Sequence, residues 1–289
     1  MSGTVGPVVT VLIAFMAIWY LAAIFLNIPF QKDIYKRADR IDVPVSELVL
    51  DTWSQKKPVL PAPHQVVVEI YETTVLKKIT SKRSLVYHTG ITLSSTMLGF
   101  LIGTSLGILL AVGIVHSRVL DKSLMPWVIS SQTIPILAIA PMIIVVLNAI
   151  GISGLLPKAM ISTYLSFFPV TVGMVKGLRS PEVIHLDLMH TYSATRLQTF
   201  LKLRFPYAIP YLFTSMKIGM AASLVGAIVG ELPTGAVAGL GARLLAGSYY
   251  GQTIQIWSAL IMAALLAGAL VALIGVLEKI TLKQLGMAQ

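Results

Sequence analysis

The 289-residue sequence has no cysteine and few charged residues, and these shortages exclude several classes of protein. Without cysteine there are neither disulfides nor thiolate metal sites. Charged residues make up 12% of the chain and hydrophobic residues 56%, whereas a soluble domain carries about 25% charged residues. The composition therefore indicates a polytopic membrane protein.

Motifs for catalysis and nucleotide binding are also missing. The sequence contains no Gly-x-x-x-x-Gly-Lys-Ser/Thr phosphate loop, so it cannot cradle ATP in that way. His185 and His190 are the two closest of five histidines, but a spacing of five does not place them on one helical face. Paired aspartates and a His-Glu-x-x-His run are absent, which disfavours an intramembrane enzyme. We expect a non-catalytic chain with no metal or cofactor of its own.

Six apolar segments come close to the length of about 20 residues that a membrane span requires. Because no basic residue precedes the first segment and no cleavage signal follows it, we expect a retained span that ends at Pro29. The sequence thus predicts an all-α membrane protein of about six transmembrane helices. The predicted spans are residues 8–30, 91–115, 127–150, 159–175, 211–229 and 254–276.

Three of these spans carry informative small or polar residues. Gly99, Gly103 and Gly107 recur at a four-residue spacing, which lets another helix approach closely. Polar residues and prolines interrupt the segment 127–150, and such groups face protein or water rather than lipid. Either they line a transport pathway or they bond neighbouring helices to one another. The candidate lining residues are Gln132, Thr133, Asn148, Thr163 and Ser166.

The segments outside the spans suggest a division of the chain into three parts. Residues 1–30 form the first span, 31–90 an external strap with a surface helix, and 91–282 a core of five spans. Four prolines in the strap favour an extended conformation. Residues 64–83 have helical periodicity, which predicts either a surface helix or a solvated connector helix. The glycine-rich segment 230–251 is expected to be a re-entrant or external loop.

The net charge of +10 would suggest nucleic acid as a partner for a soluble protein, but retained cytoplasmic loops account for it here. Five basic and two acidic residues lie in 176–204, and the loop 116–122 and the C-terminal tail are also basic. These three segments fall on one side, which should be the cytoplasm. Residues 31–88 disagree, because they hold ten basic and seven acidic residues and yet fall outside.

The basic stretch 188–210 is the longest polar, helix-compatible run between two apolar segments. Apolar residues recur there at helical spacing, and Pro206 and Pro210 are expected to stop the helix. One interpretation is an amphipathic platform on the membrane surface; the other is a loop whose charges only fix topology.

The spacing within this stretch resembles the coupling loop of bacterial ATP-binding-cassette importer permeases. That pattern has Glu-Ala-Ala, three residues, Gly, nine residues, Ile, one residue and Leu-Pro. Here Asp187-Leu188-Met189, Ser193, Leu203 and Phe205-Pro206 occupy the matching positions, and only the proline is identical. Further stretches, 60–67, 130–145, 167–180 and 205–219, resemble the branch that imports nitrate, taurine and aliphatic sulfonates.

The resemblance implies the type I importer permease fold, with a cytoplasmic coupling loop at 176–206. It implies a multi-pass protein of the bacterial inner membrane, in which two permease copies form the pathway through the lipid bilayer. It also implies two cytoplasmic subunits that use ATP and Mg²⁺, and an external binding protein that delivers a small molecule. That molecule is a nitrate, taurine, aliphatic sulfonate or pyrimidine vitamin precursor. The residues expected to couple to the ATPase are Asp187, Leu188, Met189, Ser193, Leu197, Leu203 and Pro206.

The alternative function is a secondary carrier driven by an ion gradient. Such carriers place carboxylates or histidines near mid-membrane. The predicted spans hold none there, since Glu231 lies at the end of the fifth span and other acids lie in loops. No internal repeat of the kind found in many carriers is evident either.

Overall fold

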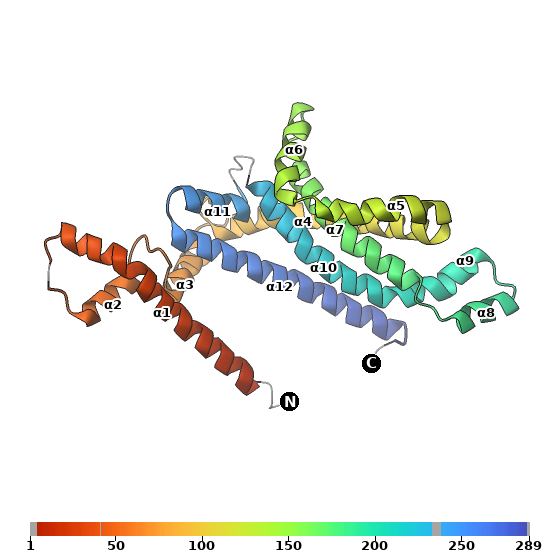
Figure 1. Ribbon diagram of the computed structural model, residues 1–289, viewed down its shortest axis with the longest axis horizontal. Helices are drawn as coiled ribbons and strands as arrows, with labels where there is room; N and C mark the ends of the chain where they lie inside the picture. Colours follow the sequence, from red (N-terminus) through yellow and green to blue (C-terminus); the bar gives the residue numbers. More distant parts are fainter. Residues whose placement is uncertain (1–4, 41, 233–237, 288–289) are drawn as a thin grey trace. The chain divides into compact units, whose positions relative to one another are not determined.

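A computed structural model describes residues 5–40, 42–232 and 238–287 (Figure 1). All regular elements among these residues are helices, as the composition predicts. The chain divides into two compact units: an N-terminal unit of residues 1–88 and 242–263, and a core unit of residues 89–241 and 264–289.

Five helices are long and apolar enough to cross a membrane, and a broken pair of helices provides a sixth crossing if its two halves form one span. The expectation of about six transmembrane helices is confirmed. The five long helices are α1 (Val5–Arg37), α4 (Leu85–His116), α7 (Leu155–Leu178), α10 (Phe205–Glu231) and α12 (Thr253–Gln284).

The broken pair replaces the single straight span predicted over residues 127–150. It consists of α5 (Arg118–Ser130), a 3₁₀ turn η2 (Ser131–Thr133) and α6 (Ile136–Ala149), and its halves meet at 102°. The break follows from Pro135, because a proline disfavours helical geometry in the residue before it. Ile134 is accordingly extended, with φ −85° and ψ 122°.

In the N-terminal unit, two expectations drawn from prolines are wrong. α1 does not end at Pro29 but continues to Arg37, because a membrane helix tolerates one missing backbone bond when the remaining bonds hold. The strap is not simply extended either: α2 (Val45–Trp53) lies within it, and α3 (Pro63–Tyr71) begins where it ends. The surface helix predicted up to Arg83 ends earlier, with a π-helical turn η1 (Glu72–Leu76).

Asn27, which lies in α1 and is fully buried, explains why the strap folds back. Its amide nitrogen donates to the carbonyls of Thr52 and Leu60, at 3.1 and 2.8 Å. Its amide oxygen accepts from the N–H groups of Val59 and Leu60, at 2.8 and 3.1 Å. One side chain thereby satisfies four backbone groups of a segment that has few backbone partners of its own.

In the core unit, α7 and α10 form the most extensive helix pair of the described residues, and they lie side by side in Figure 1. α4 packs on α7 through the glycines predicted for close approach. A Cβ atom added to Gly99 would lie 2.3 Å from Cβ of Ser162, and one added to Gly107 would lie 2.9 Å from the carbonyl oxygen of Phe167. The helix-packing role predicted from the glycine spacing is confirmed.

In the C-terminal part of the core unit, Lys217 of α10 forms an ion pair with Glu278 of α12. The glycine-rich segment differs from the loop that was expected there. The glycine-rich segment contains a helix, α11 (Leu240–Tyr249), which at ten residues is too short to span a bilayer. The expected loop also includes residues 233–237, which lie outside the described residues.

Candidate functional site

The coupling segment, residues 183–206, consists of two short helices rather than the single helix expected over 188–210. α8 (Val183–Thr191) ends in a turn, and α9 (Arg196–Thr199) begins after it. A π-helical turn η3 (Phe200–Arg204) then joins α9 to α10 without interruption. In Figure 1 the pair lies where α7 ends and α10 begins.

Ser193 forms the turn between these helices and has a left-handed backbone conformation, with φ +50°. Its N–H donates to the carbonyl of His190 at 2.8 Å, and the N–H of Ala194 donates to that of Met189 at 2.9 Å. This bond pair is the helix end that usually contains glycine in the left-handed position. Serine therefore adopts here the conformation for which the importer pattern has glycine.

The residue after this turn starts the second helix. The hydroxyl of Thr195 accepts from the N–H of Gln198 at 3.3 Å, and the side chain of Gln198 accepts from the N–H of Thr195 at 2.8 Å. This reciprocal cap satisfies two N–H groups that a helix start would leave unpaired.

Pro206 does not stop the helix, and neither does Pro210, which lies inside α10. A proline ring collides with the carbonyl four residues earlier in a regular helix, and a widened π turn relieves such a collision. η3 provides that wider turn directly before Pro206. The result is one continuous helix from Arg196 to Glu231, so the coupling segment and the span behind it are a single mechanical element.

The predicted coupling residues divide by exposure into two groups. Asp187, Leu188, Ser193 and Leu197 are exposed and Met189 is half-buried, whereas Leu203 is only 9% exposed and Pro206 is half-buried. Large apolar side chains are exposed along the same segment, which is typical of a protein-binding surface. They form the coupling patch: Val183, Ile184, Leu188, Tyr192, Leu197 and Leu201.

A polar contact holds the coupling segment to the end of α7, and an ion pair joins that end to α5. The guanidinium of Arg204 donates to the carbonyl of Leu178 at 3.0 Å, which also satisfies an otherwise unpaired carbonyl at the end of α7. Beside it, Arg179 and Asp121 form an ion pair at 2.9 Å. The segment is therefore bonded to the end of α7, and the residue after α7 is in turn paired with α5.

The five candidate pathway residues do not come together. Gln132 and Thr133 are exposed at the break between α5 and α6, and Asn148 is exposed near the end of α6. Thr163 and Ser166 are buried between α4 and α7, where their hydroxyls donate to the carbonyl of Gly99 at 3.1 and 3.4 Å. These two therefore bond helices together, which was the alternative to lining a pathway. The role of the other three stays a prediction.

A buried cluster around Glu231 lies at the end of the core unit opposite the coupling segment. The Glu231 side chain is fully buried. Its carboxylate accepts from the hydroxyl of Thr92 at 3.0 Å and from the N–H of Gly241 at 2.8 Å, and it lies 3.9 Å from the ammonium of Lys158. The cluster joins α4, α7 and α10 to the start of α11.

Gly239 closes this cluster. Its φ is +126°, and a Cβ atom there would lie 2.2 Å from the carboxyl carbon of Glu231. Sequence reasoning missed the cluster because Thr92 and Glu231 are 139 residues apart in the chain. The available signal was a carboxylate directly after an apolar run, followed by glycines.

Lys158 and Arg243, two basic residues outside the predicted cytoplasmic loops, both have carboxylate partners. Lys158 faces Glu231 and also donates to the carbonyl of Ala238 at 3.2 Å. Arg243, in the N-terminal unit, lies 3.7 Å from Glu69. Burial lowers the pKa of the Arg243 guanidinium, and the Glu69 carboxylate opposes that shift.

In this helical membrane protein, the basic coupling segment continues directly into a membrane span. Such an architecture suits a transport subunit that a separate partner moves. Residues 103–284 match the family described as binding-protein-dependent transport system inner membrane component, and the chain belongs to this family. It is a permease subunit of an ATP-driven, binding-protein-dependent importer in the bacterial inner membrane, and the expected importer branch is confirmed. Nothing supports the alternative of a secondary carrier.

Three relatives illustrate the similarity. A probable ABC transporter permease protein of Haemophilus influenzae is 32% identical over 61% of this chain and 69% of that protein. The riboflavin transport system permease protein of Chloroflexus aurantiacus is 31% identical over 78% of this chain and 80% of its own length. The formylaminopyrimidine transport permease protein of Halalkalibacterium halodurans is 31% identical over 63% of this chain and 68% of its own length.

The left-handed turn predicts opposite responses to substitution at Ser193. Ser193→Gly should raise the free energy of unfolding by about 0.5–1 kcal/mol, because glycine adopts positive φ without strain. Ser193→Val should lower it, because a β-branched residue resists that conformation. Thermal unfolding of the purified protein measures both. Ser123→Gly, at an exposed position inside α5, is the control and should be destabilising. Stabilisation by glycine at both positions would contradict the assigned turn.

The buried cluster predicts a large effect of Glu231→Gln. This substitution leaves Lys158 in a buried site without its carboxylate. Removing one partner of a buried pair costs about 3–5 kcal/mol, and the 3.9 Å separation favours the lower end of that range. Chemical unfolding should show this loss, with partial recovery in Glu231→Gln/Lys158→Met. Glu278→Gln breaks a more exposed pair and should cost less. Equal losses in the two single variants would contradict the cluster's role.

Proposed function

We propose that two copies of this chain form the transport pathway and that each docks its coupling patch on a cytoplasmic ATPase subunit. The observation that carries the proposal is the exposed coupling patch, two of whose residues, Leu197 and Leu201, lie on a helix that continues into α10. ATP and Mg²⁺ are used by the partner subunit, and the permease supplies the surface that receives its movement. An external binding protein delivers the substrate to the opposite side.

Force has two routes from the coupling patch into the membrane. Through α9 and η3 it reaches α10 without a break in the helix. Through the bond from Arg204 to Leu178 it reaches the end of α7. Movement of the patch therefore displaces α7 and α10 together, which supports coupling between the ATPase and the packed centre of the core unit.

The substrate class that we propose is a neutral nitrogen heterocycle, such as a vitamin or its pyrimidine precursor. Two relatives of at least 31% identity are named for riboflavin and formylaminopyrimidine. An anionic substrate such as nitrate or a sulfonate would favour an unpaired cation or helix N-terminus along its path. Lys158 and Arg243, two cations outside the predicted cytoplasmic loops, are instead engaged by carboxylates.

Coupling is tested by Leu197→Glu, which puts a charge into the coupling patch at a side chain that is 66% exposed. The variant should fold and insert normally, because Leu197 contributes little to the core. Stimulation of the partner ATPase, and transport, should fall more than tenfold, as expected for the loss of an interface hot spot. Leu285→Glu, an exposed leucine in the C-terminal tail, is the matched control and should stay within about twofold. Undiminished transport in Leu197→Glu would remove the support for docking at this patch.

The substrate class is tested with the solute-binding protein that stimulates the reconstituted importer. Calorimetric titration should give about micromolar or tighter affinity for a flavin or an aminopyrimidine, which corresponds to about −8 kcal/mol or more. Nitrate, taurine and an alkyl sulfonate should bind at least 100-fold more weakly. Tighter binding of any of these anions would overturn the substrate class while leaving the coupling proposal intact.

A further inference from the structure

The carboxyl-terminal end of α1 forms one wall of a cavity in the N-terminal unit. The cavity has a volume of about 280 Å³ and is lined by α1, the chain that follows it and α2. Its lining residues are Lys32, Tyr35, Lys36, Arg40, Val43 and Leu48.

The wall is held in a fixed arrangement by contacts around Tyr35, which is only 7% exposed. Its hydroxyl donates to the carboxylate of Asp51 at 2.5 Å. The guanidinium of Arg40 lies 5.5 Å from the centre of its ring and forms an ion pair with Glu47 at 2.7 Å. The charge of Arg40 is therefore already compensated, and its role is to close the wall.

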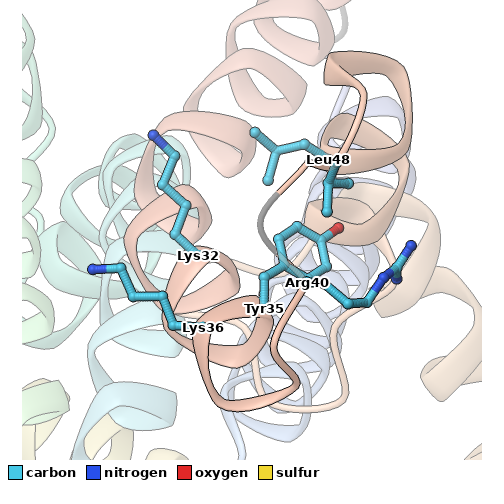
Figure 2. A pocket seen from close by; sticks show the side chains of 6 residues that line it. Lys32, Tyr35, Lys36, Arg40 and Leu48 are labelled. Atoms are coloured by element: carbon cyan, nitrogen blue, oxygen red, sulfur yellow. The ribbon is translucent and has the colours of Figure 1, made fainter.

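Lys32 and Lys36 are the cations that remain available. They are one helical turn apart, so both lie on the same face of α1. Figure 2 shows their side chains extending to the same side, away from the guanidinium of Arg40. Neither lysine forms an ion pair with any residue that the structure describes. An anionic group beside this face would meet two unpaired ammonium groups.

The position of these lysines along α1 fixes their depth. The apolar run of α1 ends near Phe30, and at 1.5 Å per residue Lys32 and Lys36 lie about 3 and 9 Å beyond it. The headgroup layer on each side of a bilayer is about 5–8 Å thick. Lys32 therefore lies within the headgroup layer, and Lys36 lies at its outer edge, from where its long side chain can reach a lipid phosphate.

We propose that this cavity binds the headgroup of an anionic phospholipid. The phosphate is bound by Lys32 and Lys36, and the glycerol portion enters the cavity against Tyr35, Val43 and Leu48. The depth and the apolar lining favour a lipid over a free phosphate ion, which has no apolar part. They also favour it over an acidic protein surface, which would have to fit a cavity of this size at the bilayer boundary.

The test uses the full chain in lipid nanodiscs that contain phosphatidylglycerol and phosphatidylcholine. Native mass spectrometry after transfer to detergent counts the phosphatidylglycerol molecules retained. Each surface lysine contributes about 1 kcal/mol to binding of an anionic lipid, so Lys32→Gln/Lys36→Gln should weaken retention roughly 25-fold. Lys56→Gln/Lys57→Gln removes the same charge from exposed positions of the same unit and should stay within about twofold.

A second variant separates the cavity from the charge. Leu48→Trp fills the cavity while leaving both lysines in place, and it should also reduce retention of phosphatidylglycerol. Thermal unfolding confirms that each variant is folded.

Three results would overturn the proposal. The first is an equal loss of lipid retention in the two lysine variants, and the second is displacement of the lipid by millimolar inorganic phosphate or glycerol 3-phosphate. The third is unchanged lipid retention in the Lys32→Gln/Lys36→Gln variant together with a loss of stimulation by the binding protein. The last would indicate an acidic protein partner. The first two outcomes do not depend on the proposed coupling or substrate class.

Discussion

Glycines line the contact between α7 and α10, and the rest of the core unit depends on how closely these two helices approach. A Cβ atom at Gly177 would lie 2.8 Å from Cα of Ala208, and one at Gly226 would lie 2.8 Å from Cα of Ser162. Lipid provides no hydrophobic force to drive such contacts, so dispersion between closely packed backbones must stabilise them. Side chains larger than hydrogen at these positions would move the helices apart.

This contact connects two polar clusters at opposite ends of the pair. At one end Arg204 bonds the coupling segment to the end of α7. At the other end Glu231 and Lys158 join the same two helices. α10 spans 27 residues between them, or about 40 Å. A closely packed helix pair transmits displacement rather than absorbing it, so a shift at the coupling patch reaches the buried carboxylate.

Much of the fold could be predicted from residue patterns, and the failures share a physical cause. Length and hydropathy located the spans because lipid requires long helices with their backbone bonds satisfied internally. Pro29, Pro206 and Pro210 were wrongly expected to end helices, since rules for proline derive largely from water, where a broken helix can bond to solvent. Pro135 did break a helix, and there a 3₁₀ turn precedes it. The presence of a proline alone therefore does not distinguish a helix that continues from a helix that breaks.

The candidate site could be predicted from the sequence about as far as the fold could. The spacing from Asp187 to Pro206 predicts a coupling segment, whose role stays a prediction, and the departure from glycine at Ser193 identified the residue with the unusual backbone. Exposure could not be predicted, so Leu203 was grouped with residues that reach solvent. Thr163 and Ser166 have the same polarity as pathway residues, and only their position opposite Gly99 shows that they bond helices. The Glu231 cluster depends on tertiary contacts that local sequence does not encode.

The bonds of Asn27 have a consequence for biogenesis. Its first acceptor, the carbonyl of Thr52, follows 25 residues later in the chain, which at rates of about 5–20 residues per second corresponds to roughly 1–5 s of translation. During that interval the amide has none of its native acceptors, and hydrocarbon would leave it unsatisfied at considerable cost. The nascent helix must therefore keep this residue at the aqueous boundary until the ribosome has delivered the strap. Synthesis order thus sets how far α1 enters the bilayer before the chain folds back on it.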